Sequence, residues 1–383
     1  MPHLYTPFKH LFNTINRETL PIHSYPKIPS MNNQPFLLGI IFLLLGTGVL
    51  SAQDFHYSQF YNNPLHLNPA LTGVFGGDAR LSANYKSQWP SVPVDFQTFS
   101  VAYDRKFFRK LNKPGIWSAG IAFNYDRAGD SKLTWADIDG NVSYTAYLSE
   151  TTFLTFGGQL GIVSRSFNEA NLRFDNQFNT GRGEYDPSLG SGEVFAGDSR
   201  AFLDFAIGVN LRLQAKRDNP ILHEVNSRTR FDIGVALHHL TTPDQSFFDD
   251  EKVPIERRLS PYIMVNYQVS KQLDIVGNLT YQTQGPVYEE LVAMGGLRYF
   301  LQSKPGRQFS VMGGLGLRQN DIQDAWWPTL EVGYNNLNVG LNYDFNVSRF
   351  DRATENRGGW ELSLRYIFRR IRPLPGYRSC PLI

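Results

Sequence analysis

Few residues of this 383-residue chain combine the types and spacings that catalysis or metal binding requires. His238 and His239 offer imidazole ligands, but adjacent strand residues point to opposite faces, so a shared ion is not expected. The acidic run Asp249-Asp250-Glu251 carries the oxygen ligands that a divalent cation such as Ca²⁺ prefers, but a solvated loop face is the better explanation of it. Glycine-rich stretches lie within strand-like sequence, where close packing is the simpler reason for them than phosphate binding. The sequence therefore predicts no catalytic residues, no metal site and no cofactor.

The composition narrows the class of protein. The formal net charge is +2, with 42% hydrophobic, 19% charged and 14% aromatic residues. A nearly neutral chain lacks the basic surface that nucleic acid requires, and its apolar content is too high for a disordered protein. The single cysteine, Cys380, cannot form an intramolecular disulfide or a cysteine-based zinc site. These features favour one large β structure.

The first fifty residues resemble a secretory leader. Residues 36–50 form an apolar run that has the length of a signal-peptide core but falls short of the ~20 residues of a spanning helix. Small residues before Gln53 predict cleavage between Ala52 and Gln53, and a membrane anchor is the alternative. Met31 is a second candidate start. Residues 1–52 are therefore predicted to be leader and signal peptide.

The rest of the chain alternates with a period of two. In residues 337–346, for example, apolar side chains share one face and Asn, Gly or Asp the other. Such a segment approaches the roughly 9–11 residues of a tilted transmembrane strand, and only a closed barrel leaves no unpaired edge in lipid. The pattern predicts an all-β fold, a single antiparallel transmembrane barrel of about fourteen strands over residues 78–369; a soluble β-sandwich is the alternative. The expected strands are 78–88, 94–106, 115–126, 133–147, 152–166, 201–214, 230–240, 259–269, 272–282, 289–300, 308–317, 326–334, 337–346 and 359–369.

Connection lengths and aromatic positions support the barrel. Connections after odd strands include long ones, 167–200, 241–258 and 347–358. Those after even strands are short except 215–229, which predicts a periplasmic N-terminus, external long loops and a periplasmic tail at 370–383. Aromatic residues at strand ends are expected to form interfacial girdles: Trp89, Trp117, Trp135, Tyr147, Tyr299, Trp326, Trp327 and Trp360.

Residues 53–77 do not read as a membrane strand. Two Asn-Pro pairs interrupt regular structure, because proline lacks an N–H and restricts the residue before it. The density of aromatic and amide side chains predicts an ordered segment, packed in or under the barrel mouth as a plug. The polar residues expected to point inward fit a wet or plugged lumen: Asp204, Asn210, Asn278, Asn342 and Arg365.

The run from Ser58 to Gly73, followed by Gln88-Trp89-Pro90, resembles the PorP/SprF family of the type IX secretion system of Bacteroidetes. Residues 343–348 and 358–366 and the terminal Cys380-Pro381 are also similar to that family, whereas residues 168–258 are least so. The motif residues that carry the resemblance are Ser58, Gln59, Phe60, Asn63, Pro64, Asn68, Pro69, Gly73, Gln88 and Trp89.

The resemblance implies an outer-membrane barrel of fourteen strands, similar to fatty-acid transporter barrels, without enzymatic activity. Family members act in protein secretion or gliding motility. The implied partners are outer-membrane lipid, other type IX secretion components, a periplasmic peptidoglycan-binding protein and secreted cargo with a C-terminal sorting domain, with no nucleic acid among them. The leading hypothesis is therefore a barrel that acts in export, retention or surface attachment of cargo. The alternative is a passive channel or transporter for small or hydrophobic solutes.

Overall fold

The computed structural model describes residues 54–89, 96–107, 115–215, 228–249, 252–286, 288–304, 307–320, 325–347, 355 and 357–369. The predicted leader, the cleavage position before Gln53 and the C-terminal tail with Cys380 lie outside the described residues. Asp250 and Glu251 of the acidic run do so as well. In the described parts of the chain, no helix is long and apolar enough to cross a membrane.

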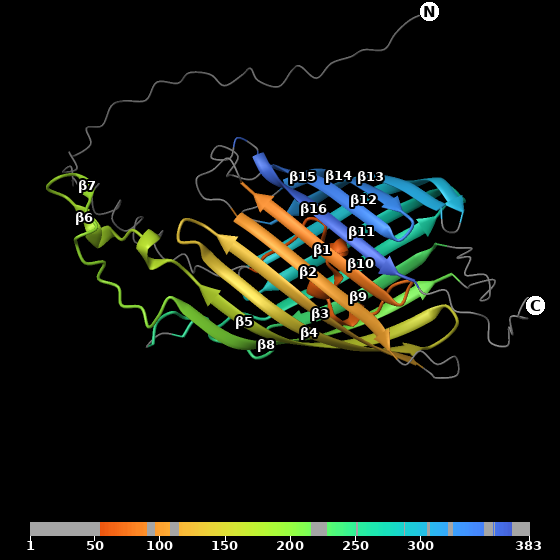
Figure 1. Cartoon of the computed structure of the whole chain (residues 1–383), viewed down its shortest axis with the longest axis horizontal. Helices are drawn as coiled ribbons and strands as arrows, with labels where there is room; N and C mark the ends of the chain where they lie inside the picture. The colour runs from red at the N-terminus through yellow and green to blue at the C-terminus, as the bar shows by residue number, and fades with distance from the viewer. Residues whose placement is uncertain are drawn as a thin grey trace, which may run out of the picture. The chain divides into compact units, whose positions relative to one another are not determined.

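Fourteen antiparallel strands form a closed barrel (Figure 1), which confirms the predicted fold class. Chain neighbours pair throughout, and the first strand pairs with the last along its whole length, from Ala79↔Phe368 to Gln88↔Gly359. The barrel strands are β1 (Ala79–Gln88), β2 (Phe96–Phe107), β3 (Gly115–Ala128), β4 (Leu133–Tyr147), β5 (Thr152–Ser166), β8 (Ser199–Gln214), β9 (Arg230–His238), β10 (Arg258–Gln268), β11 (Leu273–Gln284), β12 (Tyr288–Lys304), β13 (Arg307–Gln319), β14 (Ala325–Tyr334), β15 (Leu337–Asn346) and β16 (Arg357–Phe368).

The period-two pattern places apolar side chains outside and polar ones inside. Along β14 exposed and buried residues alternate without interruption. Its Leu330 and Tyr334 are 50% and 60% exposed on the outer surface, whereas Glu331 is only 2% exposed inside. A surface of exposed apolar side chains around a polar interior suits a barrel in lipid, since a soluble sandwich would bury the apolar face.

Two of the aromatic residues assigned to the girdles point inward instead. Trp327 of β14 is fully buried in a cluster of lumen side chains, and Trp135 of β4 donates from Nε1 to Asp137 Oδ2 at 2.5 Å. Their positions near strand ends did not reveal their faces. Trp326 and Trp360, by contrast, are 44% and 39% exposed.

The two rims of the barrel differ. We call the rim where β1, β3, β5, β9, β11, β13 and β15 end the long-loop mouth, and the opposite rim the short-turn mouth. The long-loop mouth carries the connection between β5 and β8, with the two-residue strands β6 (Phe178–Asn179) and β7 (Glu184–Tyr185). It also carries the connection between β9 and β10. At the short-turn mouth β14 and β15 are joined by two residues, Asn335 and Asn336.

The two long connections pack together through phenylalanine rings. Phe167 lies 5.0 Å from Phe195 and 4.6 Å from Phe247 between ring centroids, and Phe195 lies 5.1 Å from Phe248. Arg200 reinforces the contact with an ion pair of 2.7 Å to Asp244. The loops of residues 167–198 and 239–249 therefore form one ordered structure at the long-loop mouth.

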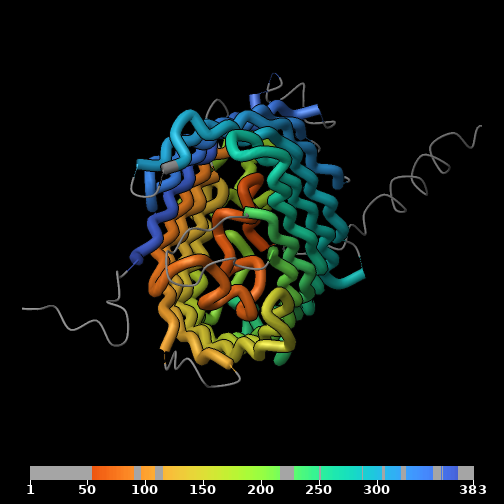
Figure 2. Tube along the Cα trace, turned by 90° about the vertical axis from the view of Figure 1, so that its right-hand side faces the viewer, coloured from red at the N-terminus to blue at the C-terminus, as the bar shows by residue number. Residues whose placement is uncertain are grey.

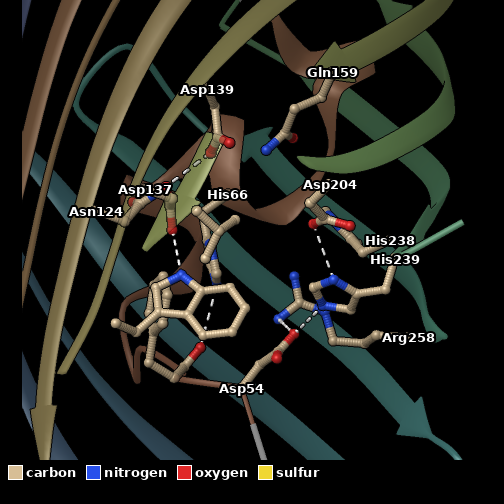
Figure 3. A pocket seen from close by; sticks show the side chains of 13 residues that line it. Asp54, His66, Asn124, Asp137, Asp139, Gln159, Asp204, His238, His239 and Arg258 are labelled. Carbon is tan, nitrogen blue, oxygen red and sulfur yellow. Dashed lines mark hydrogen bonds and ion pairs between the residues drawn. The ribbon is translucent and has the colours of Figure 1, made fainter. Parts of the chain in front are cut away.

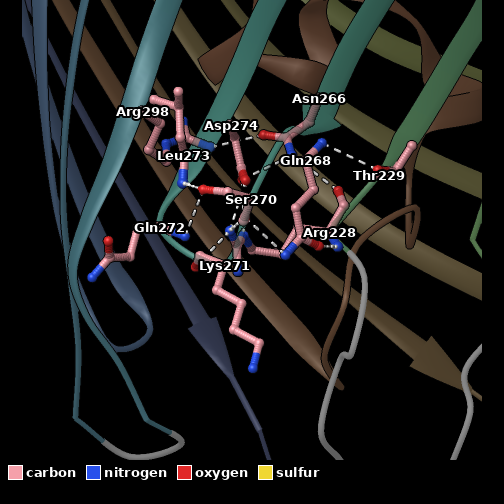
Figure 4. A network of polar contacts seen from close by, with 10 residues as sticks. All are labelled: Arg228, Thr229, Asn266, Gln268, Ser270, Lys271, Gln272, Leu273, Asp274 and Arg298. Carbon is pink, nitrogen blue, oxygen red and sulfur yellow. Dashed lines mark hydrogen bonds and ion pairs between the residues drawn. The ribbon is translucent and has the colours of Figure 1, made fainter.

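Arg228 organises part of the short-turn mouth (Figure 4). Its guanidinium forms an ion pair of 2.7 Å with Asp274, donates to the carbonyl oxygens of Ser270 and Lys271, and lies 4.0 Å from the centre of the Phe300 ring. One side chain thus joins the start of β9 to the β10–β11 turn.

Replacing Arg228 with alanine should loosen this rim. Asp274 is 1% exposed as a side chain, so removing its guanidinium partner leaves a buried carboxylate, at a cost of about 3–5 kcal/mol. Arg228→Lys should recover little, because an ammonium cannot reproduce the forked donation to Asp274 and two carbonyls. Amide hydrogen exchange at residues 269–273 measures the effect. Unchanged exchange in Arg228→Ala would show that the turn holds its shape without this side chain.

A segment of residues 54–78 lies inside the barrel, and we call it the lumen segment. Figure 2 looks into the barrel and shows this segment surrounded by the strands. It contains three short helical turns, η1 (Phe60–Asn62), α2 (Pro64–Leu67) and η2 (Pro69–Leu71). All residues from Tyr57 to Leu65 and from Leu67 to Phe75 are buried.

Candidate functional site

The two Asn-Pro pairs shape the lumen segment. Pro64 and Pro69 each begin a helical turn, where the missing N–H of proline costs nothing and its fixed φ suits the helix. Asn68 caps the second turn, because its Oδ1 accepts a hydrogen bond of 2.7 Å from Ala70 N. The prolines that exclude a strand here thus produce a compact, turned chain.

Asn68 also fastens the lumen segment to the wall. Its Nδ2 donates to the carbonyl oxygens of Val209 on β8 and Val235 on β9, each at 3.1 Å. It also lies 3.3 Å from Tyr262 Oη. Because Asn68 is fully buried, each bond replaces one to water that the side chain has lost.

Inward glycines of the wall make room for this contact. A Cβ at Gly157 of β5 would lie 2.5 Å from Ala70 Cα, and one at Gly208 of β8 would lie 2.7 Å from Asn68 Cγ. On the other side of the lumen, a Cβ at Gly340 would lie 2.5 Å from Gln59 Oε1. Gly157 allows the backbone of the lumen segment to approach the wall, whereas Gly208 and Gly340 leave room for the side chains of Asn68 and Gln59, which explains strand glycines that otherwise weaken a sheet.

Ser58 and Gln59 are held by acidic residues of the last two strands. The Glu361 carboxylate accepts from Ser58 N at 2.8 Å and from Gln59 N at 2.9 Å. Ser58 Oγ donates to Asp344 Oδ2 at 2.8 Å, and Gln59 Nε2 donates to Asn342 Oδ1 at 2.6 Å. Charge-assisted bonds of this kind are stronger than neutral ones, so this contact is a main attachment of the segment.

The same region contains a group of buried charges. Arg318 pairs with Asp344 at 2.9 Å and donates to Ser58 Oγ at 3.1 Å. Lys86 Nζ donates to the carbonyl oxygen of His56 at 3.1 Å. Lys86, Arg318, Asp344 and Glu361 are each at most 3% exposed. Buried charges are tolerated only when paired and hydrogen-bonded, so the lumen segment completes a network that would be costly without it.

The apolar side of the lumen segment packs against β10 to β14. Phe60, Tyr61, Leu67, Leu71 and Val74 form one buried cluster with inward residues of those strands. The wall residues of this cluster are Tyr262, Val276, Val292, Met294, Met312 and Trp327. The segment therefore packs an apolar cluster against β10–β14, in addition to its polar contacts with β8, β9, β13, β15 and β16.

The segment is fixed again near the short-turn mouth. Gly73 N donates to Asp104 Oδ2 at 2.7 Å, and Arg80 Nη2 donates to the same carboxylate oxygen at 2.8 Å and to Leu71 O at 3.0 Å. Gly73 has φ +75°, a left-handed conformation that glycine adopts without strain. A motif glycine therefore directs the chain toward β1.

Asp54 closes the other end of the segment at the long-loop mouth (Figure 3). Its Oδ2 lies 2.7 Å from His239 Nε2 and 3.0 Å from Arg258 Nη1, and Oδ1 accepts from Gln284 Nε2 at 3.2 Å. His239 Nδ1 in turn lies 2.9 Å from Asp204 Oδ2. A cavity of about 30 Å³ adjoins these residues. We call the contact of Asp54 with His239, Arg258 and Gln284 the Asp54 latch.

The Asp54 latch depends on charge. Burial alone would lower the pKa of His239, but the carboxylates of Asp54 and Asp204 outweigh it and raise this pKa from 6.5 to about 9. Burial would likewise raise the pKa of Asp54, and His239 and Arg258 together hold it well below its ordinary value of 3.8. Both groups are therefore charged at neutral pH.

The stabilisation from His239 should be lost in alkaline solution. Because the pKa of His239 is higher in the folded than in the unfolded state, protonation of His239 stabilises the folded protein. This stabilisation is complete below the unfolded-state pKa of 6.5 and disappears as the pH rises through about 9. His239→Asn should thus lower the melting temperature at pH 6 and change it little at pH 10. A difference that stays constant over this range would mean that His239 acts without its charge.

The structure corrects the expectation for the two histidines. Both are 4% exposed inside the barrel, because β9 ends at His238 and the chain turns at His239, where φ is +56°. His238 Nε2 lies 3.3 Å from Leu67 O, whereas His239 contacts Asp54. Among the described residues, no group of three or more His, Cys, Asp or Glu is placed to hold a metal ion.

The motif residues gather in one place. All of them except Gln88 and Trp89 belong to the lumen segment, and these two lie at the long-loop end of β1. The sequence singled out Asn68 and Gly73 without their partners. Nothing in the sequence indicated that Glu361, Asp104 and the wall glycines contact this segment, because they look like ordinary inward strand residues.

Several solved structures are similar to this chain at low sequence identity. The monoaromatic hydrocarbon channel CymD is 11% identical, with 81% of this chain and 93% of that chain covered and a TM-score of 0.45. The Pseudomonas putida toluene transporter TodX is 10% identical, with 81% and 95% covered and a TM-score of 0.43. A Pseudomonas aeruginosa FadL homologue is 11% identical, with 79% and 93% covered and a TM-score of 0.44. No curated protein matches by sequence.

The family comparison accounts for most of the chain. The model of the type IX secretion system membrane protein PorP/SprF matches residues 49–366. That range includes the lumen segment with its motif and almost all of the barrel. The chain belongs to the PorP/SprF family of type IX secretion system membrane proteins, and it is an outer-membrane β-barrel.

Proposed function

We propose that this protein acts in the export, retention or surface attachment of cargo proteins, with the lumen segment as a plug. The observation that carries the proposal is that the family motif coincides with the segment inside the barrel. A passive channel needs an open path, but here Ser58, Gln59 and Asn68 are fully buried against the wall. A plugged barrel leaves its two mouths as the surfaces through which it acts.

The long-loop mouth is the proposed cargo surface, and we place it outside the cell. Its loops of residues 167–198 and 239–249 are held together by Phe167, Phe195 and Phe247. Other apolar side chains there remain exposed, among them Phe178 at 51% and Val194 at 85%. Exposed apolar groups on an ordered loop structure suit a protein contact.

The short-turn mouth is proposed to face the periplasmic partners of the secretion system. Asn335–Asn336 and the turn of residues 269–272 are short, and Arg228 fixes the latter. A peptidoglycan-binding protein is the partner that the family suggests for this face. Such a partner would contact these short turns, whereas cargo would contact the longer loops of the opposite mouth.

Gene deletion with complementation tests the proposal. Deletion should remove cargo from the cell surface or the medium, and the intact gene should restore it. A complementing variant with Phe178→Ser and Val194→Ser should assemble in the outer membrane and restore cargo less well. Unchanged secretion and motility after deletion would refute the proposed role, and steady conductance of the wild-type protein in planar bilayers would favour the channel instead.

A further inference from the structure

The two ends of the lumen segment lie at opposite mouths of the barrel. At its start, Asp54 contacts His239, which follows the end of β9, and Gln284, the last residue of β11. At its end, Asp78 N donates to the carbonyl oxygen of Phe368, the last residue of β16, at 2.9 Å. His239 and Gln284 lie at the long-loop mouth and Phe368 lies at the short-turn mouth, so the lumen segment crosses the barrel from one mouth to the other.

Contacts along the way follow the same order, with one detour. Ser58 meets Asp344 near the long-loop end of β15, and Ser143 Oγ donates to Thr72 O close to the short-turn end of β4. Between them α2 turns back, since Leu67 O lies 3.3 Å from His238 Nε2. The chain thus returns toward the long-loop mouth at α2 and then continues to the short-turn mouth.

Burial along the segment agrees with two open ends. Asp54, Phe55 and His56 are half-buried, the interior of the segment is buried, and Gly76 is exposed again. The buried stretch between these two ends agrees with a chain that enters the lumen at one mouth and leaves it at the other.

We propose that the N-terminus of the mature chain leaves the lumen at the long-loop mouth and is displayed outside the cell. There it lies beside the loops of residues 167–198 and 239–249, within reach of any protein bound to them. The Asp54 latch holds this end in place. The proposal rests on the orientation given under the proposed function, which puts the long-loop mouth outside, and on cleavage before Gln53. It replaces the periplasmic N-terminus that the connection lengths predicted, because only the start of β1 at Ala79 needs to lie on the periplasmic side.

Cysteine labelling on intact cells tests this display. In a Cys380→Ser background, Gly-Cys-Gly is inserted after Gln53, and matched insertions are made after Gly190 in the long loop and after Asn335 in the β14–β15 turn. A membrane-impermeant maleimide is applied before and after permeabilising the outer membrane. The cysteines after Gln53 and Gly190 should label in intact cells at least ten-fold faster than the one after Asn335.

The outcomes are distinct. If the cysteine after Gln53 labels only after permeabilisation, together with the one after Asn335, the proposal is overturned. If Asn335 alone labels in intact cells, the display outside is overturned and so is the orientation, whereas secretion of cargo by the same strains still tests the proposed function separately. Phe55→Cys provides a second variant without an insertion, should the first fail to give the heat-modifiable band of a folded barrel. It should label from the same side as Gly190.

Discussion

Replacing Gly157 with alanine should displace the part of the lumen segment around η2. The new Cβ would lie 2.5 Å from Ala70 Cα, and it would meet backbone atoms of Pro69 and Ala70, which cannot rotate away. Overpacking of this kind costs about 1–3 kcal/mol where the surroundings adjust, and here the helical turn η2 must move. We expect faster amide exchange at residues 70–74 and steady conductance in planar bilayers, where the wild-type protein should be silent.

The adjacent residue provides a matched control. Gly158 lies on the same strand, and a Cβ there would meet nothing within 4 Å. Gly158→Ala should therefore leave exchange, conductance and the melting temperature as in the wild-type protein. If the Gly157 and Gly158 variants behave alike, η2 is not seated against β5 in the folded protein.

Replacing Glu361 with alanine should release the part of the lumen segment around Ser58 and Gln59. The carboxylate is 1% exposed and accepts from the backbone of Ser58 and Gln59, so its loss leaves two buried donors without an acceptor. An unsatisfied buried donor costs about 1–3 kcal/mol, and breaking a buried charge network costs about 3–5 kcal/mol. Amide exchange at Ser58 and Gln59 and the melting temperature measure the loss.

Two further substitutions separate the causes. Glu361→Gln keeps one carbonyl acceptor without the charge, so its effect should lie between those of the wild type and Glu361→Ala. Leu362→Ala changes the neighbouring residue on the outer face, where Leu362 is 41% exposed, and should leave exchange at Ser58 unchanged. An equal loss in Glu361→Ala and Leu362→Ala would point to damage to β16 rather than to the attachment of the segment.

The barrel was predictable from the sequence because its signal is local. A period of two over ten residues identifies a strand whatever lies beside it, and the observed strands match the expected ones to within a few residues. Faces near strand ends were harder to assign. Trp135 and Trp327 point inward, and His239 follows a turn in the chain that periodicity does not express.

The attachment of the lumen segment was not predictable, because its partners are remote in sequence. Ser58 and Glu361 are 303 positions apart, and nothing local distinguishes Glu361 from any other inward acid. Gly157 and Gly158 look equivalent in the sequence, although only the first faces η2. The motif from Ser58 to Gly73 indicated an ordered segment, but not the wall positions that receive it.

The pairing of β1 with β16 has a consequence for biogenesis. Lumen-segment residues that precede β1 depend on Asp344, Glu361 and Ser363, all contributed by the last two strands of the chain. During synthesis these acceptors are made last. Ser58, Gln59 and Asn62 therefore cannot form these hydrogen bonds until nearly the whole polypeptide has been made. The final zipping of β1 onto β16 and the satisfaction of the enclosed polar groups therefore coincide. A polypeptide truncated before β15 has neither the closing partner of β1 nor these acceptors.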